Sequence, residues 1–221
     1  MKNPIKFHFP YFLIYLVFVL LSILILIASS KAPIHFLINS YHHPIADTFF
    51  KYITYLGDGL TILVVAIILL FFSKRKLLMI VLSGIFSGLI AQFLKKVVYG
   101  PMARPSQFFN DLDVQLYYVP GVDLHTVFSF PSGHSTSVFA LATSLVLIQK
   151  NRKYDIPIII IAILVAYSRM YLSQHFLIDV FVGSLIGVSV SLIVFFILYS
   201  NKSLQKTEWD NSLINFGTNR N

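Results

Sequence analysis

A histidine and an aspartate near the C-terminal end of the chain have the types and the spacing needed for acid–base or nucleophilic chemistry. His175 and Asp179 are four residues apart, so on a helix their side chains lie on one face. The carboxylate can accept a hydrogen bond from one imidazole nitrogen and leave the other available as a base or nucleophile. Asp179 lies inside an apolar run, where a carboxylate without a partner is costly. The pair predicts either a catalytic dyad or a structural hydrogen bond.

A second group of residues, Pro131-Ser132-Gly133-His134, stands at the start of another apolar run. Ser132 is a good helix N-cap, and Gly133 allows another group to approach the backbone closely. The N–H groups and the dipole of a helix start favour phosphate oxygens. His134 at the mouth of such a site could donate a proton to a departing oxygen. This stretch therefore predicts a phosphate site with a general acid beside it.

Four cations accompany these two groups. Arg169 lies six residues before His175, and its guanidinium fork suits phosphate oxygens. Arg104 precedes a proline in a long loop, and Lys95 and Lys96 end an apolar run. A single cation near a membrane surface can simply reach the lipid headgroups. Because these cations occur together with two histidines, we expect a phosphate-binding site rather than a set of structural contacts.

The elements that must position these residues are membrane helices. Of the 221 residues, 57% are hydrophobic and 12% are charged, and the mean hydropathy is +0.77. These values exclude a soluble globular protein and a disordered chain. The chain has no cysteine, which excludes disulfides and thiolate chemistry. A helix needs about 20 apolar residues to cross a bilayer, and the runs that approach this length are about 10–28, 56–73, 77–95, 132–149, 156–173 and 176–199.

The distribution of positive charge predicts how these six runs are oriented. Eleven of the 17 Lys and Arg residues lie before the first run, between the second and third, between the fourth and fifth, or after the sixth. Short cytoplasmic loops collect such charges, so both termini are expected in the cytoplasm. The net charge of +8 then reflects topology and not binding to nucleic acid. The first run is longer than a signal-peptide core and no A-x-A site follows it, so an uncleaved helix is expected.

The chain therefore divides into a six-helix membrane domain, residues 1–200, and a polar cytoplasmic tail, residues 201–221, which we expect to be flexible. Two pairs of small residues, Gly84/Gly88 and Gly183/Gly187, predict close packing of helices within the bundle. Hydroxyl side chains predict that the helix over 132–149 is central; they are Ser135, Thr136, Ser137, Thr143 and Ser144.

No cofactor and no metal are expected. His35, His42 and His43 lie in the first outer loop without an accompanying carboxylate or cysteine pattern, so surface histidines are favoured over metal ligands. The other polar residues of the outer loops, interpreted as solvated or as minor substrate contacts, are Asp111, Asp113, Asp123, Tyr117, Tyr118 and His125.

Three of these patterns resemble the signatures of the type-2 phosphatidic acid phosphatase (PAP2) family. Five residues separate Ser168-Arg169 from His175, and three separate His175 from Asp179. This pattern resembles the third signature. Pro131-Ser132-Gly133-His134 is similar to the second signature, and Arg104-Pro105 to the end of the first. The resemblance implies an all-α, six-transmembrane-helix bundle with a metal-free phosphatase site at the outer leaflet. It also implies a fold core shared with vanadium haloperoxidases.

The resemblance further implies a role for each matching residue. His175 would be the nucleophile that forms a phosphohistidine, Asp179 would orient it, and His134 would protonate the leaving oxygen and later activate water. The residues that would hold the phosphoryl oxygens are Arg104, Arg169, Ser132 and Gly133, the last through its amide.

The first signature departs from the family pattern at its lysine. The family places six residues between that lysine and Arg-Pro, whereas seven separate Lys96 from Arg104, and the expected position holds Val97. Gly100-Pro101 lies between them and can absorb an insertion. We therefore expect Lys96 as the phosphate ligand, with Lys95 as its rival and with neither lysine as a further alternative.

Together these observations predict an integral membrane lipid phosphatase that needs no metal and hydrolyses a phosphomonoester or diphosphate of an outer-leaflet lipid. The small outer loops resemble those of bacterial proteins, so the expected location is the inner membrane with the site facing the periplasm. The expected substrates are undecaprenyl diphosphate, phosphatidylglycerol phosphate, phosphatidic acid or lipid A. The alternatives are a lipid phosphotransferase that uses the same site and a non-catalytic lipid-binding or transport protein.

Overall fold

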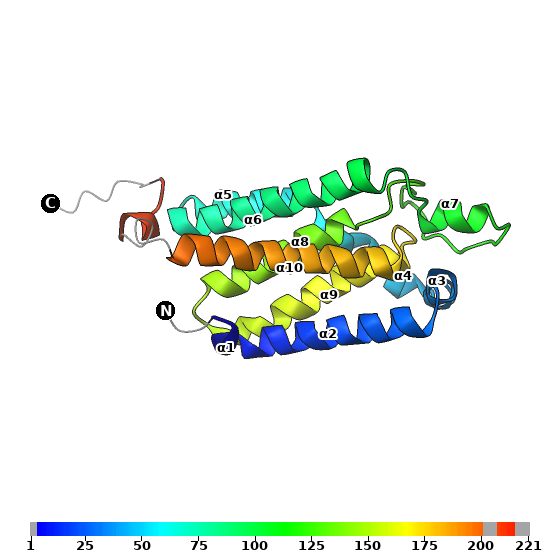
Figure 1. Ribbon diagram of the computed structural model, residues 1–221, viewed down its shortest axis with the longest axis horizontal. Helices are drawn as coiled ribbons and strands as arrows, with labels where there is room; N and C mark the ends of the chain where they lie inside the picture. Colours follow the sequence, from blue (N-terminus) through cyan, green and yellow to red (C-terminus); the bar gives the residue numbers. More distant parts are fainter. Residues whose placement is uncertain (1–3, 201–206, 215–221) are drawn as a thin grey trace.

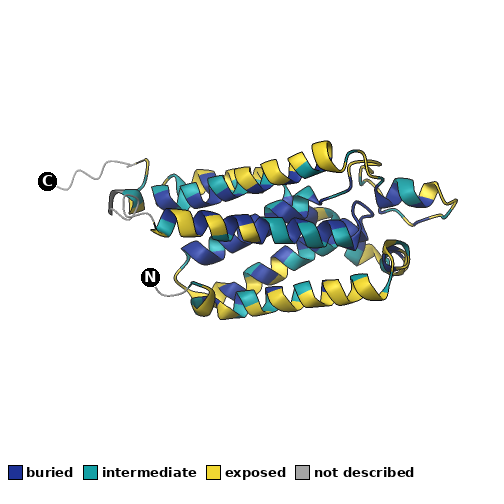
Figure 2. Cartoon of the chain, viewed as in Figure 1, coloured by how far each residue is buried: buried dark blue, intermediate teal, exposed yellow. Residues whose placement is uncertain are grey.

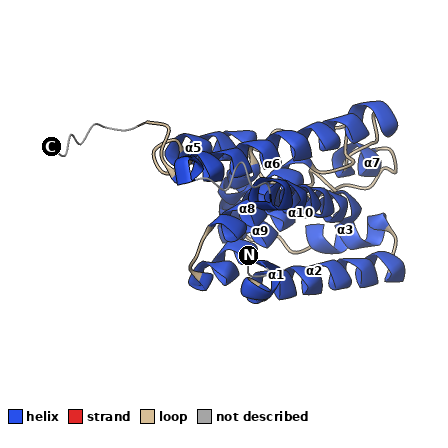
Figure 3. Ribbon diagram, turned by 60° about the vertical axis from the view of Figure 1, so that its left-hand side comes forward, coloured by secondary structure: helices blue, strands red, loops and turns tan. Residues whose placement is uncertain are grey.

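The computed structural model describes residues 4–200 and 207–214, and within these ranges every regular element is helical (Figure 3). The all-α prediction is therefore confirmed for this part of the chain. A 3-10 turn, Thr54–Gly57, follows α4, and a π-helical turn, Leu94–Val98, follows α6. The helices in Figure 1 are α1 (Pro4–Phe7), α2 (Phe9–Ala28), α3 (Lys31–Asn39), α4 (Pro44–Ile53), α5 (Gly59–Leu69), α6 (Lys74–Phe93), α7 (Pro105–Asn110), α8 (Gly133–Ile148), α9 (Asp155–Tyr171) and α10 (Leu177–Ser200).

The described chain has four helical stretches that are long and apolar enough to cross a membrane: Phe9–Ala28, Lys74–Val98, Arg152–Tyr171 and Leu177–Ser200. Pro44–Gly57 and Gly59–Leu69 form a fifth candidate that is bent by 56°. The predicted run over 56–73 begins only at Gly59, because Asp58 before it has an extended backbone. The helix α8 is apolar but has 16 residues. The protein is thus an integral membrane protein, whereas six complete spans and cytoplasmic termini stay predictions.

The helix α8 is the centre of the bundle, as its hydroxyl residues predict. It lies against α10, α6 and α9, and Figure 2 shows that most of it is buried. Its polar side chains find partners on neighbouring helices: the hydroxyls of Tyr11 and Thr143 lie 2.9 Å apart, and Ser144 donates to Ser191 at 3.2 Å. The outer face of α2, in contrast, exposes side chains such as Ile27. Such an apolar outer surface suits contact with lipid.

Two glycines of α10 set its distance from α8. A Cβ atom at Gly187 would lie 2.5 Å from the carbonyl oxygen of Thr136 and 2.7 Å from the amide nitrogen of Ala140. A Cβ atom at Gly183 would lie 2.6 Å from the carbonyl oxygen of Ser132. The predicted close packing is therefore confirmed at this pair, and it brings the first turns of α8 and α10 together. At the other predicted pair it is wrong for Gly88, where a Cβ atom would meet nothing within 4 Å.

The two ends of the bundle are built differently. At one end α3, α4, α7 and the segment 99–131 form a cap, and at the other end lie α1 and the segment 207–214 (Figure 1). Within the latter segment, the Leu213 amide donates to the Leu70 carbonyl oxygen at 2.9 Å, and Asp210 Oδ1 lies 3.4 Å from Arg75 Nε. The remaining residues of the expected flexible tail, 201–206 and 215–221, lie outside the described residues.

Replacing Gly187 with alanine tests the contact between α8 and α10. Because the new methyl group would overlap backbone atoms of α8, Gly187→Ala is expected to destabilise the fold by about 1–3 kcal/mol. The measurement is the thermal unfolding midpoint in detergent. Gly88→Ala is the matched control, since a Cβ atom there would meet nothing within 4 Å. Equal midpoints for the two variants would contradict this account of the packing.

Candidate active site

The candidate site residues of the sequence gather at the cap end of the bundle. The first turn of α8 carries Ser132, Gly133 and His134, and the turn between α9 and α10 carries His175. The amide of Ser132 donates a hydrogen bond to the carbonyl oxygen of Asp179 at 3.0 Å. This bond fixes the start of α8 against the first turn of α10, so the two histidine-bearing segments are held side by side.

The predicted pair of His175 and Asp179 is present and almost completely buried, since each residue is 2% exposed. Nδ1 of the imidazole lies 3.3 Å from Oδ2 of the carboxylate. The same oxygen accepts hydrogen bonds from the Ser129 hydroxyl at 2.5 Å and from the Phe176 amide at 3.0 Å. These contacts fix the carboxylate, and the carboxylate in turn orients the ring with Nε2 available for reaction.

The surroundings of His175 keep its ring neutral. Burial lowers the pKa of His175 well below its usual value, and the positive charges of Arg104, Arg169 and Lys95 lower this pKa further. A neutral imidazole has a lone pair on one nitrogen, which a nucleophile or base requires. The cations therefore have two effects: they attract an anionic group, and they help to keep the ring unprotonated.

The first turn of α8 has the features expected of an anion site. The hydroxyl oxygen of Ser132 caps the helix by accepting from the Ser135 amide at 3.3 Å, and it also accepts from the Ser135 hydroxyl at 2.9 Å. The hydroxyl proton of Ser132 remains able to donate to a ligand. A Cβ atom at Gly133 would meet no heavy atom within 4 Å, so the backbone is open on that side.

His134 faces a pocket of about 230 Å³ at the cap end. Its Nε2 lies 3.1 Å from Oδ1 of Asp58, and the two side chains are 28% and 42% exposed. Arg169 also lines this pocket, as does His125 from the long outer loop. Burial, and then the charges of Arg104 and Arg169, lower the pKa of His125. His125 therefore lies close enough to these two arginines to feel their charge.

The two predicted arginines are both buried and directed by hydrogen bonds. Arg104 is 9% exposed; its Nε donates to the Val127 carbonyl oxygen at 2.9 Å, and a terminal nitrogen donates to the Gln174 side chain at 3.1 Å. Arg169 is 6% exposed and donates to the Thr54 hydroxyl at 2.6 Å. Its Nε has no hydrogen-bond partner among the described residues. A buried donor of this kind favours an anionic ligand.

The expectation for the lysine of the first signature needs correction. Lys95 is 7% exposed and its charge acts on His175, whereas Lys96 is exposed. Both stand in the π-helical turn Leu94–Val98. A π turn contains more residues per turn than an α-helix and changes which side chain faces inward. The structure therefore brings Lys95, and not Lys96, to the other predicted residues.

Several residues of the site carry no sequence motif. Asp58 faces His134, Thr54 holds Arg169, Gln174 holds Arg104, and Ser129 holds Asp179. Only Asp58 gives a signal in the sequence, because it interrupts an apolar run. The others are ordinary polar residues whose partners are 50 to 115 positions away.

The expectation that the histidines of the first outer loop are surface residues is wrong for two of them. His35 is 1% exposed and its Nε2 lies 3.1 Å from the Ser173 hydroxyl. His42 is half-buried, and its Nδ1 lies 2.9 Å from Oδ1 of Asp47. Ser173 is distant from His35 in the sequence, and Asp47 follows His42 by five residues. The spacing of the histidines alone therefore does not reveal these partners. Within the described residues, no group of three or more His, Asp or Glu side chains could hold a metal ion.

The residues gathered at this end of the bundle are a buried histidine with a carboxylate, a second histidine and three cations, and residues of these types suit phosphoryl chemistry. A profile of the PAP2 superfamily matches residues 74–203, more than half of the chain, and the protein belongs to this superfamily. The relatives found by comparison are named as phosphatases. The chain is therefore a membrane phosphatase of the PAP2 type.

Two curated relatives and two solved structures show the extent of the similarity. The chain is 29% identical over 179 residues to the lipid A 4'-phosphatase of Porphyromonas gingivalis, covering 78% of this chain and 72% of that protein. It is 29% identical over 162 residues to the undecaprenyl-diphosphatase BcrC of Bacillus subtilis, covering 72% and 77%.

The crystal structure of Aquifex aeolicus LpxE matches with a TM-score of 0.65 and 30% identity, over 75% of this chain and 94% of that one. The structure of a PAP2 type phosphatidylglycerolphosphate phosphatase from Bacillus subtilis matches with a TM-score of 0.64 and 24% identity, over 93% and 100%. The latter likeness concerns the fold alone.

The neighbouring lysines provide a direct test of the corrected assignment. Lys95→Met is expected to lower kcat/KM by about 100-fold or more, because it removes a buried charge beside the phosphoryl position. Lys96→Met is expected to change it by less than about threefold, since an exposed charge contributes little. Phosphate release by the two purified variants is the measurement. A larger loss in Lys96→Met would restore the original expectation from the sequence.

Ser129 is expected to act by positioning Asp179. Ser129→Ala removes a hydrogen bond to a buried carboxylate, so kcat should fall by about 10- to 100-fold while KM changes little. Steady-state kinetics separate the two constants. Ser106→Ala is a matched control, because this buried serine donates to the His125 carbonyl oxygen and contacts neither His175 nor Asp179. Similar kcat values in the two variants would argue against the positioning role.

Proposed function

We propose that this protein hydrolyses a phosphomonoester or a diphosphate of a membrane lipid through a phosphohistidine on His175. The observation that carries the proposal is a neutral, buried imidazole, oriented by Asp179 and surrounded by Arg104, Arg169 and Lys95. Phosphoryl transfer depends chiefly on positioning and on neutralising charge, and this cluster supplies both.

In the first step Nε2 of His175 attacks the phosphorus atom, and the bond between phosphorus and the leaving oxygen breaks. The cations and the donors at the start of α8 hold the equatorial oxygens, and His134 gives its proton to the leaving oxygen. In the second step His134 takes a proton from water, the water oxygen bonds to phosphorus, and the bond from phosphorus to nitrogen breaks. Inorganic phosphate leaves and both histidines return to their starting states.

Asp58 gives His134 the support that this acid–base role requires. A carboxylate 3.1 Å from Nε2 can stabilise the protonated ring before the proton is donated. The two side chains are partly exposed, so water can reach His134 for the second step. No step of this scheme needs a metal ion, and we propose a metal-independent reaction.

The position of the site suggests which leaflet supplies the substrate. The basic segments 74–76, at the start of α6, and 150–153 belong to the end of the bundle opposite the site. Because such loops face the cytoplasm, we propose six spans, cytoplasmic termini and a site at the outer leaflet of a bacterial inner membrane. The relatives named above favour undecaprenyl diphosphate or lipid A as substrate class, and phosphatidylglycerol phosphate and phosphatidic acid share the required chemistry.

The experiment is phosphate release by detergent-purified protein from a panel of these lipid phosphates, with chelator present. His175→Ala should abolish release, and Asp179→Asn should reduce it by about 100-fold or more, because the ring loses its orientation and charge stabilisation. His43→Ala is the control histidine, since its side chain is exposed and accepts a hydrogen bond from the nearby Ile45 amide.

Two results would contradict parts of the proposal. Near-normal turnover in His175→Ala would refute the nucleophile, and loss of wild-type activity that Mg²⁺ restores would refute metal independence. If phosphate appears only after a lipid with a free hydroxyl group is added and that lipid becomes phosphorylated, the protein is a phosphotransferase. Absence of both reactions from folded protein would favour a non-catalytic lipid-binding role.

A further inference from the structure

A cation outside the three signatures lies at the edge of the active-site pocket. Lys51 of α4 lines the pocket of about 230 Å³ that contains His134 and Arg169. It also lines a second pocket of about 340 Å³, which opens on the outer surface between α4 and the long loop. Lys51 therefore stands on the wall that the two pockets share. A ligand whose head reaches His134 through these pockets would pass this ammonium group on its way out.

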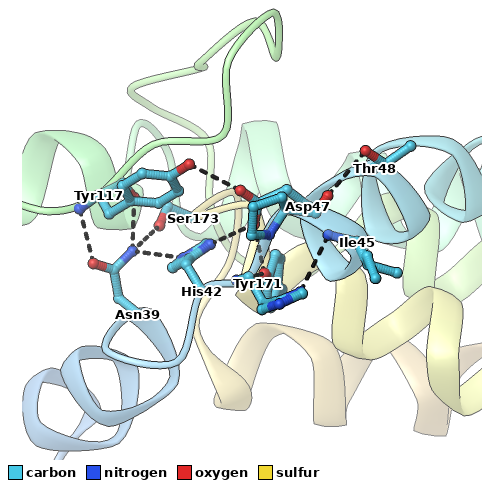
Figure 4. A network of polar contacts seen from close by, with 10 residues as sticks. Asn39, His42, Ile45, Asp47, Thr48, Tyr117, Tyr171 and Ser173 are labelled. Atoms are coloured by element: carbon cyan, nitrogen blue, oxygen red, sulfur yellow. Dashed lines mark hydrogen bonds and ion pairs between the residues drawn. The ribbon is translucent and has the colours of Figure 1, made fainter.

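The second pocket has a fixed polar wall. Oδ1 of Asp47 accepts from the Tyr171 hydroxyl at 2.5 Å, and its Oδ2 accepts from the Tyr117 hydroxyl at 2.8 Å (Figure 4). His42 Nδ1 lies 2.9 Å from Oδ1. Asn39 joins this network to the loop by donating to the Tyr117 carbonyl oxygen at 2.8 Å. The pocket is thus held in shape by contacts between segments far apart in the chain.

The same network leaves Lys51 without a carboxylate partner. Asp47 is one helical turn before Lys51 and shares its face of α4, but three side chains already occupy the Asp47 carboxylate. Within the described residues no ion pair involves Lys51.

The ammonium group instead donates to the carbonyl oxygen of Pro120 at 2.9 Å. An ammonium group has three donors, so two can still bind an anion. The loop is shaped around this group: Gly121 has a φ of +69°, and a Cβ atom there would lie 2.6 Å from the Nζ of Lys51. Glycine satisfies both the backbone conformation and the close approach.

We infer that Lys51 binds a second phosphate of the substrate, next to the phosphoryl group that is transferred, and that the preferred substrate is a lipid diphosphate. This inference rests on the proposed phosphatase reaction. The terminal phosphoryl group occupies the cluster at His175, and the bond that breaks joins its phosphorus to the bridging oxygen. The leaving group is a lipid monophosphate, whose growing negative charge lies at the pocket wall that carries Lys51. His134 supplies the proton to the bridging oxygen.

A matched pair of substrates tests the inference: farnesyl diphosphate and farnesyl phosphate, which have the same tail and differ by one phosphate. Lys51→Met should lower kcat/KM for the diphosphate by about 10- to 100-fold, because a charge-assisted hydrogen bond is lost. It should change kcat/KM for the monophosphate by less than about threefold. Lys51→Arg, which keeps the charge, should retain most of the activity towards the diphosphate.

Lys31→Met is the matched control for the loss of one positive charge at this end of the bundle. Lys31 lies 4.3 Å from the centre of the Phe108 ring and lines neither pocket, so the ratio of the two kcat/KM values should not change. If the wild-type protein hydrolyses only the diphosphate, a raised KM in Lys51→Met together with recovery in Lys51→Arg supports the inference.

The inference and the proposed function can fail separately. If Lys51→Met lowers both rates by one factor, Lys51 only ties α4 to the loop, and the inference is overturned while the phosphatase stands. The same conclusion follows if the diphosphate rate is unchanged, or if the wild-type protein hydrolyses only the monophosphate. If the folded wild-type protein releases phosphate from neither substrate nor from any lipid of the panel, the proposed function is overturned, and the inference with it.

Discussion

The hydrogen bond from the Ser132 amide to the Asp179 carbonyl oxygen is the contact on which the site depends. It joins the start of α8, which carries His134, to the first turn of α10, which carries Asp179 and directly follows His175. In the proposed reaction the two histidines act on opposite sides of a phosphoryl group. The bond can form only because Gly183 and Gly187 allow the helices to approach so closely. Side chains at these positions would separate the helices and with them the two halves of the site.

A second constraint is electrostatic. Three cations lie together in a largely apolar bundle, where each charge loses much of its hydration. Backbone carbonyl oxygens, the Thr54 hydroxyl and the Gln174 side chain compensate part of this loss for Arg104 and Arg169. In the proposed reaction a phosphate group would supply the remaining compensation through its own charge. The same cluster of positive charge that would bind phosphate also adds to burial in keeping His175 neutral.

The sequence predicts most of the catalytic cluster, because its residues stand in short motifs at the ends of apolar runs. The central position of α8 and the close packing at Gly187 also follow from local composition. The assignment of Lys96 fails because a π-helical turn cannot be read from the residues that form it. The break at Asp58, which turns one predicted span into a bent pair, gives only a weak signal.

Partners of the catalytic residues are harder to predict than the residues themselves. Thr54 meets Arg169 across 115 positions, and Ser129 meets Asp179 across 50. Neither pair has a characteristic spacing, since the fold alone brings them together. Sequence patterns thus reveal the reacting groups, whereas the groups that orient them become visible only in three dimensions.

The Nε of Arg169, buried and without a partner among the described residues, has a consequence for handling the protein. A buried donor that an anion can satisfy links folding to anion concentration, because a ligand that binds the native state alone stabilises it by RT ln(1 + [L]/Kd). Buffers with millimolar phosphate should then extend the life of the purified protein in detergent. The product of the reaction would act as a folding aid as well as an inhibitor.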